Sequence, residues 1–331
     1  MKTLVTGGGG FLGRYIVEQL LARGDEVTVF ARGAYPELEQ IGVKLCRGDL
    51  QDPEAVARAV AGMEAVFHVA AKAGYWGTWA SFYGPNVVGT RNVIAACRRQ
   101  GVPKLIYTST PSVVASSHDR AGADESLPYP THFESFYSQT KAMAEQFVRQ
   151  ANSDDLLTVS LRPHIVFGPR DTQILPRLVA RARAGKLIRI GAGTNQVDVT
   201  YVEDAAQAHL LAAVALEPGS ALAGSVYFIS QDDPVTLWPW VNALLEQLEV
   251  PPVTKSIPLS LARTIGGVLE TVYYMFKLKG EPRLTRFLAN ELALSHYYDI
   301  SRAKQDFGYR PQFSMAEAVA RTVEYFRQQN F

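Results

Sequence analysis

The chain has 331 residues, of which 47% are hydrophobic and 20% charged. This length suits one large α/β domain or two coupled ones, and the composition is typical of a soluble globular protein rather than a disordered or fibrous one. The net charge of +1 gives no basic footprint for nucleic acid or for an anionic membrane. Cys46 and Cys97 are the only cysteines, too few for a disulfide framework and too widely spaced for a zinc site, so we expect a reducing, cytoplasmic setting.

Short β-branched runs alternate with helical periodicity through the first half of the chain. Gly24 stands where the first helix should end, and Asp52 followed by Pro53 is a typical helix start. Strict alternation predicts parallel strands joined by crossover helices, which is a doubly wound α/β sheet of the Rossmann type. The expected strands are residues 2–6, 26–31, 43–48, 65–71, 104–110 and 157–163, and the expected helices are 10–23, one from 53 onward, 84–100 and 137–151.

The pattern changes after residue 170, where proline and glycine spacing becomes irregular. We expect a nucleotide-binding Rossmann domain over 1–170, with returning pieces at about 195–230, and a smaller, mostly helical substrate-binding part over 171–331. Ligands of open α/β sheets bind at the carboxyl ends of the strands, so the second part should cover that edge. Its helix-like stretches are residues 203–216, 237–248, 259–276 and 314–328.

One apolar segment, "IPLSLARTIGGVLETVYYMFKLKG" at 257–280, raises the question of a membrane span. Arg263, Glu270 and Lys277 interrupt it at seven-residue intervals, so it is not expected to cross a bilayer. We expect an amphipathic helix that packs on its own protein. A surface helix that touches lipid is the alternative.

The stretch "TLVTGGGGFLGRY", residues 3–15, places a glycine loop between a strand and a helix. Glycines permit a tight turn and let the backbone approach a pyrophosphate, while the helix N-terminus supplies free N–H groups. Two registers fit, either Gly7 or Gly8 followed by Gly10 and Gly13, and the glycines alone do not choose between them. The loop predicts a dinucleotide site.

The end of the second strand indicates which dinucleotide binds. A site selective for NAD has a carboxylate there for the ribose 2′-hydroxyl, but this strand ends "VFARG". Arg32 can pair with a 2′-phosphate, so NADP(H) is favoured over NAD(H), with a solvated surface arginine as the alternative. Asp49, after the third strand, either accepts a hydrogen bond from adenine or caps the next helix.

Tyr137 and Lys141 in "YSQTK" lie four residues apart at the start of an expected helix, so both emerge on one face. A phenol has a pKa near 10, and a neighbouring ammonium group brings it closer to the working range of an acid or base. The fifth strand ends in "YTSTPSV", whose hydroxyls include Thr110. A hydroxyl there can bind the substrate oxygen as hydride moves.

Four motifs now stand in order: "TGGGGFLG", "YTSTPSV", "YSQTK" and "RPHIVFGP". Together they resemble the extended short-chain dehydrogenases/reductases, whose marks are TGxxGxxG, a Ser or Thr after strand five, YxxxK and RPxxxxGP. The resemblance covers essentially the whole chain. It implies the register Gly7, Gly10 and Gly13, and it leaves Gly8 and Gly9 as loop residues whose small size is not required.

The resemblance also implies roles at the active site. Tyr137 would be the catalytic acid/base, and Lys141 would lower its pKa and hold the nicotinamide ribose. Thr110 stands in place of the usual serine, with Ser109 as the alternative hydroxyl. Further cofactor contacts are expected at Phe11, Leu12, Leu50, Ala70 and Pro163.

Within that superfamily the chain looks most like the 3β-hydroxysteroid dehydrogenase branch. The stretches "FHVAAKAGYWG", "GEPRLTRF" and "DISRAKQDFGYRPQ" resemble, more narrowly, bacterial 2-alkyl-3-oxoalkanoate reductases of long-chain olefin biosynthesis. This resemblance implies NADPH-dependent reduction of a hydrophobic 3-oxo acid to the 3-hydroxy acid, and other olefin-pathway enzymes as partners. Members of the superfamily usually dimerise through the corresponding two helices, which implies a homodimer through helices 84–100 and 137–151.

Other functions stay open at this point. A 3β-hydroxysteroid or sterol dehydrogenase using NAD(P)+ would need the same residues. A sugar-nucleotide epimerase or dehydratase is disfavoured by "GYWGTWASFY", residues 74–83, whose five aromatics suit an apolar small molecule unless they only fill the core. A regulator that binds NADP(H) without catalysis would not need Tyr137 and Lys141. His164 and His209 lack the spacing of a metal site and are expected to be packed or capping residues.

Overall fold

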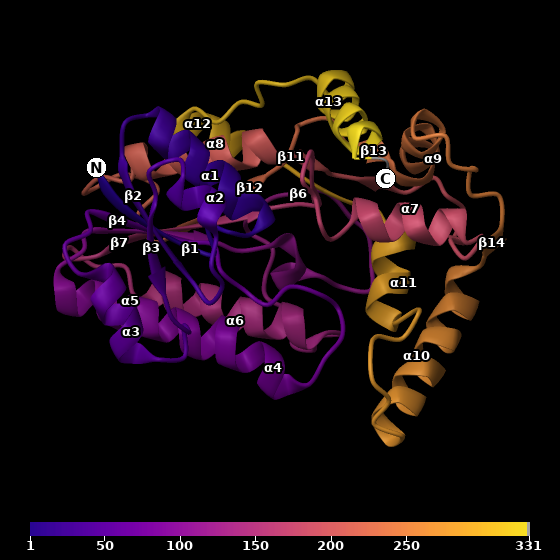
Figure 1. Ribbon diagram of the computed structural model, residues 1–331. Helices are drawn as coiled ribbons and strands as arrows, with labels where there is room; N and C mark the ends of the chain where they lie inside the picture. The colour runs from indigo at the N-terminus through magenta and orange to yellow at the C-terminus, as the bar shows by residue number, and fades with distance from the viewer. Residues whose placement is uncertain (330–331) are drawn as a thin grey trace.

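A seven-stranded parallel sheet forms the centre of the molecule, with helices on both faces (Figure 1). The structure is a computed structural model and describes residues 1–329, so the last two residues of the expected 171–331 part lie outside the described residues. The strand order is β12-β7-β5-β4-β1-β2-β3, so the direction of winding reverses between β1 and β4. Ligands of such sheets bind at this switch point. The prediction of a doubly wound sheet is confirmed.

Every one of the six expected strands is present, and β12 adds a seventh beside β7. Strand β1 pairs with β2 and with β4, which brings Thr6 level with both Phe30 and His68. The carboxyl ends of these strands therefore meet at one edge. The strands of the sheet are β1 (Lys2–Thr6), β2 (Glu26–Ala31), β3 (Lys44–Arg47), β4 (Ala65–His68), β5 (Lys104–Thr108), β7 (Leu157–Pro163) and β12 (Ser225–Ile229).

Helices cover the sheet because each presents one apolar face to it. Helix α1 buries Ile16, Val17 and Leu20, and it ends where Gly24 takes a φ of +91°. Helix α3 begins with Asp52, whose carboxylate accepts the backbone N–H groups of the first turn, as expected. One face carries α3 (Pro53–Val60), α5 (Gly89–Gln100) and α6 (Phe136–Gln150), and the other carries α1 (Phe11–Ala22), α8 (Val202–Ala215) and α12 (Ser301–Phe307).

Shorter elements connect these layers near the carboxyl edge. Residues 79–100 form one continuous helical run, in which a π-helical turn joins α4 to α5. The expected helix over 84–100 is therefore present but begins earlier. These connecting elements are α2 (Pro36–Glu39), α4 (Trp79–Tyr83), the π-helix η1 (Gly84–Val88) and the 3₁₀ helix η2 (Pro111–Val114).

The remaining part of the chain lies beyond the carboxyl ends of the strands (Figure 1). It is more than helical, because it also holds a four-stranded sheet of order β13-β10-β15-β6 that draws its strands from distant parts of the sequence. Its helices are α7 (Leu175–Arg183), α9 (Leu237–Gln247), α10 (Leu259–Met275), α11 (Arg286–Ala293) and α13 (Met315–Gln328). Its strands and bridging pairs are β6 (Arg120–Ala123), β8 (Val166–Phe167), β9 (Arg189–Ile190), β10 (Gln196–Val197), β11 (Thr200–Tyr201), β13 (Val235–Thr236), β14 (Ser256–Ile257) and β15 (His296–Tyr298).

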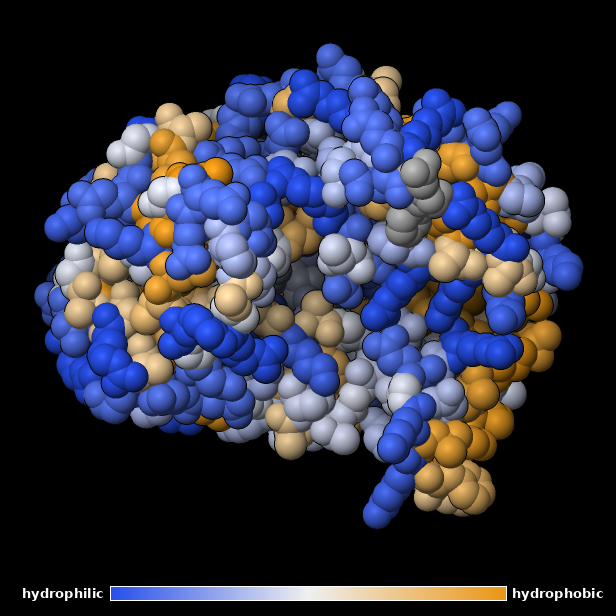
Figure 2. Space-filling model, viewed as in Figure 1, coloured by the Kyte–Doolittle hydropathy of each residue, from blue (hydrophilic) through white to orange (hydrophobic). Residues whose placement is uncertain are grey.

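Helix α10 departs from the expectation that its apolar face packs on its own protein. It buries Ala262, Gly266 and Glu270, and several of its other apolar side chains are half-buried. Figure 2 shows the hydrophobic surface over α10, whose exposed large apolar side chains are Leu261, Ile265, Val268, Tyr274 and Met275. Small residues let α10 approach α11 closely: a Cβ at Gly266 would lie 2.7 Å from the backbone of Thr285. None of the helices within residues 1–329 has both the length and the apolar character to cross a membrane.

Candidate active site

A cleft of about 1040 Å³ lies at the carboxyl ends of β1, β2, β4 and β5, next to the switch point of the sheet. Every residue that the sequence assigns to cofactor binding or catalysis lines this cleft, although the motifs come from distant parts of the chain. Those residues are Gly7, Gly10, Phe11, Leu12, Gly13, Arg32, Asp49, Leu50, Ala70, Thr110, Tyr137, Lys141 and Pro163.

The geometry of the glycine loop fits the register that begins at Gly7. Gly7 has a φ of +72°, and a Cβ on it would lie 2.8 Å from the Ala70 backbone. A Cβ on Gly13 would lie 2.2 Å from the Gly7 carbonyl oxygen. Within residues 1–329 no side chain caps the start of α1 at Gly10, and the first residues of the helix line the cleft, so its first N–H groups are available to an anion there.

The expectation that small size is not required is wrong for Gly8. A Cβ on Gly8 would lie 2.4 Å from Val29 and 3.0 Å from Val17, two fully buried side chains. A Cβ on Gly9 would lie 2.2 Å from the ring of Tyr35, which covers the loop. The second glycine of the run is therefore required by packing, whereas a side chain at Gly9 would displace the half-buried ring of Tyr35. Gly7, Gly10 and Gly13 follow the family spacing.

Arg32 and Asp49 lie at the end of the cleft formed by β2 and β3. Among residues 1–329, no hydrogen bond or ion pair engages the Arg32 guanidinium group. Asp49 does not cap α3, because Asp52 does so; its carboxylate instead accepts the backbone N–H of Gln51 at 2.9 Å. Of the two alternatives for Asp49, the helix cap is therefore wrong.

A chain of buried hydrogen bonds fixes the end of β4 beside the glycine loop. His68 contacts Thr6 Oγ1 at 2.8 Å through Nδ1 and Thr90 Oγ1 at 2.9 Å through Nε2. Burial, reinforced by Lys141, lowers the pKa of His68 to about 3, so the ring is neutral. Thr6 Oγ1 also accepts the N–H of Ala70, which holds that residue against Gly7.

Tyr137 and Thr110 meet at the other end of the cleft. Burial raises the pKa of Tyr137 above its ordinary value, and a hydrogen bond with Thr110 opposes this shift. Thr110 Oγ1 also accepts the N–H of Ser112 and lies 3.1 Å from its hydroxyl. Tyr137 is therefore a neutral phenol at pH 7, in contact with a second hydroxyl.

Lys141 lies one helical turn after Tyr137 and is almost fully buried. Its ammonium group donates a 2.6 Å hydrogen bond to the Thr108 carbonyl oxygen and lies over the ring of Tyr107. Burial lowers the pKa of Lys141 to about 7, and the carboxylate of Glu145 opposes that shift. The hydrogen bond with Thr110 lowers the pKa of Tyr137 against the effect of burial.

Ser109, the alternative to Thr110, lies on the cleft wall but is turned toward Glu145, whose pKa it helps to lower. Glu145 forms a buried ion pair with Arg162, with contacts of 2.6 and 2.9 Å, and accepts the Tyr129 hydroxyl at 2.6 Å. This pair joins α6 to β7 behind the catalytic residues. The hydroxyl next to Tyr137 is that of Thr110.

Lys72 also lines the cleft and was missed by the sequence reasoning. Its ammonium group donates to Ser81 Oγ at 2.8 Å and lies 4.6 Å from the centre of the Phe82 ring. Among residues 1–329, no carboxylate pairs with it. The side chain of Asn86 fixes the Lys72 backbone, because it accepts the Lys72 N–H and donates to the Lys72 carbonyl oxygen. The available signal was a lysine in "AAKAG", which begins two residues after β4 ends.

None of the five aromatics of residues 74–83 lines the cleft, and the stretch reaches it through Ala80 and Ser81 instead. Trp76 stacks on Tyr274 of α10, with ring centres 4.7 Å apart. Phe82 is fully buried beside Tyr137. Of the five rings only Phe82 is buried and the other four are half-buried, so the stretch as a whole neither lines the cleft nor fills the core.

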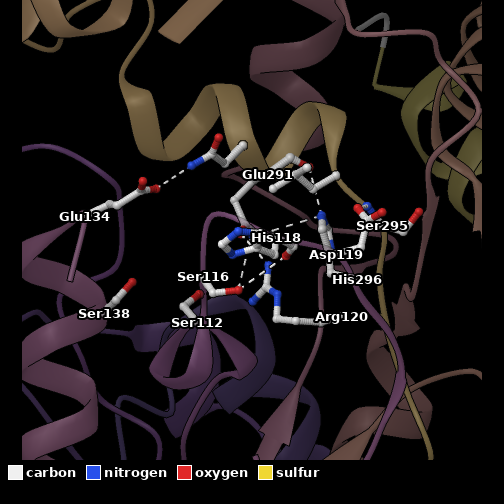
Figure 3. Close-up of polar contacts among 12 residues, drawn as sticks. Ser112, Ser116, His118, Asp119, Arg120, Glu134, Ser138, Glu291, Ser295 and His296 are labelled. Carbon is white, nitrogen blue, oxygen red and sulfur yellow. Dashed lines mark hydrogen bonds and ion pairs between the residues drawn. The ribbon is translucent and has the colours of Figure 1, made fainter. Parts of the chain in front are cut away.

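A second polar network joins α11 to the segment just before α6, the helix that carries Tyr137 (Figure 3). Asn290 of α11 donates a 2.6 Å hydrogen bond to Glu134, three residues before Tyr137, and Glu291 pairs with Arg120 at 3.0 Å. His296 lies beside Glu291 and contacts the buried ring of His164 at 2.6 Å. The network anchors α11 over the site.

The two singled-out histidines, His164 and His209, are buried and hydrogen-bonded, as expected for packed residues. Burial lowers the pKa of His209 to about 4. Within residues 1–329, no group of three or more His, Cys, Asp or Glu side chains could hold a metal ion.

Comparison with known proteins agrees with this geometry. The model of the 3-beta hydroxysteroid dehydrogenase/isomerase family matches residues 4–261. The chain belongs to this family. It is 50% identical over 324 residues to a 2-alkyl-3-oxoalkanoate reductase of Stenotrophomonas maltophilia (strain K279a), covering 97% of this chain and 98% of the relative. It is 38% identical to the decarboxylating sterol-4-alpha-carboxylate 3-dehydrogenase of Mus musculus, covering 98% and 91%.

Solved structures of similar fold bind a nicotinamide dinucleotide. The crystal structure of Thermus thermophilus UDP-glucose 4-epimerase in complex with NAD has a TM-score of 0.74 and 29% identity, covering 99% of each chain. The dTDP-glucose 4,6-dehydratase of Streptomyces venezuelae, a double mutant with NAD bound, has a TM-score of 0.77 and 25% identity, covering 100% of this chain and 98% of the other. This member of the 3-beta hydroxysteroid dehydrogenase/isomerase family is an NAD(P)-dependent oxidoreductase.

Proposed function

We propose that this protein reduces 2-alkyl-3-oxoalkanoates to the 3-hydroxy acids with NADPH. The observation that carries the proposal is Lys72, a cation without a carboxylate partner in the part of the chain that the structure describes, in the same cleft as Tyr137. A cation left unpaired in a cleft is suited to an anionic ligand. The relatives named 2-alkyl-3-oxoalkanoate reductase, at 50% and 47% identity, support the same substrate class.

The names of the two groups of relatives share one chemical feature. A 2-alkyl-3-oxoalkanoate carries its carboxylate on the carbon next to the oxo group, and a sterol-4-alpha-carboxylate carries it on the carbon next to position 3. In both, a carboxylate is attached to the carbon adjacent to the reacting one. A cation close to Tyr137 would recognise this arrangement, and Lys72 is positioned for that role.

The residues of the cleft fit NADPH. The glycine loop leaves no room for a Cβ where a pyrophosphate would approach, and the start of α1 offers free N–H groups. Arg32 has no partner among residues 1–329 and can bind a 2′-phosphate, while Lys141 and Ala70 line the expected nicotinamide end. When bound, the reduced nicotinamide supplies the hydride.

The protein's own side chains supply the proton and position the substrate oxygen. Tyr137 keeps its phenolic proton at neutral pH because burial raises its pKa, so it can donate that proton to the substrate oxygen. Thr110 is placed to donate a second hydrogen bond to the same oxygen. Hydride addition to carbon and protonation of oxygen together convert the ketone to an alcohol. Apolar side chains of Ile165, Val166 and Ile174 line the cleft and can pack on alkyl chains.

The proposal is tested by the rate of NADPH oxidation with three substrates. These are a 2-alkyl-3-oxo acid, its methyl ester and a 3-ketosteroid that lacks a carboxyl group. A charge-assisted hydrogen bond contributes about 1.5–3 kcal/mol, so kcat/KM for the acid should exceed that for the ester roughly 10- to 100-fold. Equal rates for acid and ester would contradict the assignment.

The second candidate is a sterol dehydrogenase, favoured by the relatives at 36–38% identity that are named sterol-4-alpha-carboxylate 3-dehydrogenase. A 3-hydroxysterol with a 4-carboxylate and NADP+ is its test substrate, run beside a 2-alkyl-3-hydroxy acid in the same direction. A homodimer through α5 and α6, and partners acting on neighbouring steps, remain predictions that solution mass and co-purification would test.

A further inference from the structure

The hydroxyl of Thr110 has a single proton, although it meets several hydrogen-bonding neighbours. Its Oγ1 accepts the backbone N–H of Ser112 at 3.2 Å, lies 3.1 Å from the Ser112 hydroxyl and forms a hydrogen bond with Tyr137. A hydroxyl offers one donor and two acceptor positions, so these contacts use all of them. The direction of one hydrogen bond therefore determines the direction of the others.

Ser112 is held next to Thr110 by the short 3₁₀ helix η2 (Figure 3). Thr110 is the N-cap of this helix, and the two neighbours of Ser112 in sequence, Pro111 and Val113, are buried. The Ser112 hydroxyl has no hydrogen-bond partner other than Thr110 within residues 1–329. Thr110 lines the cleft and the half-buried Ser112 does not, so Ser112 can act on a substrate only through Thr110.

Two arrangements of the hydroxyl protons satisfy these contacts, because a hydroxyl rotates and either oxygen can be the donor. In the first arrangement, Tyr137 donates to Thr110 and Thr110 donates to Ser112, which turns both protons away from the cleft. In the second, Ser112 donates to Thr110, whose own proton is then free for Tyr137 or for a substrate. Burial raises the pKa of Tyr137, and the hydrogen bond with Thr110 opposes this shift, as a donor to the phenolate does. That effect favours the second arrangement.

We propose that Ser112 is a positioning residue that directs the Thr110 proton into the cleft, by donating both its N–H and its hydroxyl to Thr110 Oγ1. With both acceptor positions of Thr110 filled from one side, its proton has only the cleft side left. There it stabilises the negative charge that develops on the substrate oxygen as hydride is added to the carbon. This inference rests on the proposed function, in which Tyr137 and Thr110 bind the same oxygen.

The first test is steady-state kinetics with NADPH and a 2-alkyl-3-oxo acid. Ser112→Ala should lower kcat roughly 3- to 10-fold, the effect of one hydrogen bond, and leave KM for the acid and NADPH binding near the wild-type values. Ser112→Thr keeps a hydroxyl and should recover most of the rate. Ser117→Ala is the matched control, because Ser117 is also half-buried and lies outside the cleft, and it should not change kcat.

The first arrangement of the protons predicts the opposite result. If Thr110 donates to Ser112, removing the Ser112 hydroxyl releases the Thr110 proton to the cleft, so kcat should stay the same or rise. An unchanged or higher kcat in Ser112→Ala would therefore overturn the inference. An equal loss in Ser112→Thr would also overturn it, because the hydroxyl would then not be the group that acts.

A double-variant cycle tests whether Ser112 acts through Thr110. Thr110→Val should lower kcat by roughly 100-fold, since it removes a donor to the developing oxyanion. Adding Ser112→Ala to Thr110→Val should cause no further loss, because no Thr110 proton remains to be directed. Losses that multiply in the double variant would show that the two residues act independently and would contradict the inference.

The ionisation of Tyr137 provides a readout that needs no substrate. Tyrosinate absorbance is followed as the pH is raised, and each protein is compared with its Tyr137→Phe counterpart. Without the Ser112 hydroxyl, Thr110 donates less to Tyr137, so Tyr137 should ionise at a higher pH in Ser112→Ala than in the wild type or in Ser117→Ala. Ionisation at the same or a lower pH would overturn the inference. This shift together with no turnover of the oxo acid by the wild type would contradict only the proposed function.

Discussion

Lys72 and Tyr137 contact the same buried side chain, Phe82. The Lys72 ammonium group lies 4.6 Å from the centre of the Phe82 ring, and the Tyr137 ring centre lies 6.4 Å from it. Because Phe82 is fully buried, it fixes the distance between a cation and a proton donor that both line the cleft. This pair can bind the carboxylate and the oxo group of one substrate.

Lys72→Met should raise KM for a 2-alkyl-3-oxo acid roughly 10- to 100-fold, since a charge-assisted hydrogen bond is lost. KM for NADPH and the rate with the methyl ester should stay near the wild-type values. Lys72→Arg should recover part of the loss, and Lys44→Met, at an exposed lysine on β3, is the control. A rise in KM for NADPH instead would assign Lys72 to the cofactor.

Arg32→Ala should weaken NADPH binding roughly 10- to 100-fold and leave NADH binding nearly unchanged, because only NADPH carries the 2′-phosphate. Dissociation constants from the fluorescence of each reduced cofactor check this. Arg58→Ala, at an exposed arginine on α3, should alter neither constant. Equal weakening of both cofactors would show that Arg32 does not select between them.

Gly8→Ala should destabilise the protein by about 1–3 kcal/mol, because the added methyl group collides with Val29 and Val17. Val29→Ala alone should also destabilise it by leaving a cavity. In the double variant, the free energy of unfolding should exceed the value expected if the two losses were additive. Chemical denaturation measures all four proteins, and simple additivity would show that the collision with Val29 is relieved elsewhere.

Lys141 should make stability depend on pH. Its pKa is about 7 in the folded protein, against an ordinary value of 10.5. Between these values the unfolded chain holds a proton that the folded chain has released, so the free energy of unfolding rises with pH. Relative to Lys141→Met, the free energy of unfolding of the wild type should therefore rise by up to about 1.4 kcal/mol per pH unit between pH 7 and 10. Below pH 7 the difference between the two proteins should not change with pH. Parallel stability curves would contradict the lowered pKa.

Much of the site could be predicted because its motifs are local. The glycine loop, Tyr137 and Lys141 are defined by spacings within one turn or helix, and the strand order then brings them together. The requirement for glycine at position 8 could not be predicted, because it comes from Val29 on a neighbouring strand. The unpaired state of Lys72 is also invisible in the sequence, because it depends on which carboxylates lie nearby in space.

The orientation of α10 shows a further limit. Its periodicity reveals an apolar face but not which face packs on the protein. The closest packing uses Ala262 and Gly266, because small residues let two helices approach, and this turns the larger side chains outward. Likewise, β6 and β15 pair through Arg120 and His296, which are too far apart in sequence for any local pattern to predict.

The central claim is that this protein reduces a 2-alkyl-3-oxo acid with NADPH by proton donation from Tyr137. The most direct measurement mixes the enzyme, NADPH and the oxo acid, follows NADPH absorbance, and identifies the product by chromatography, for the wild type and for Tyr137→Phe. We predict the 3-hydroxy acid in amounts equal to the NADPH consumed, a loss of roughly 100- to 10,000-fold in rate for the variant, and unchanged NADPH binding. Absence of the hydroxy acid with the wild type, or its formation at an undiminished rate by Tyr137→Phe, would contradict the claim.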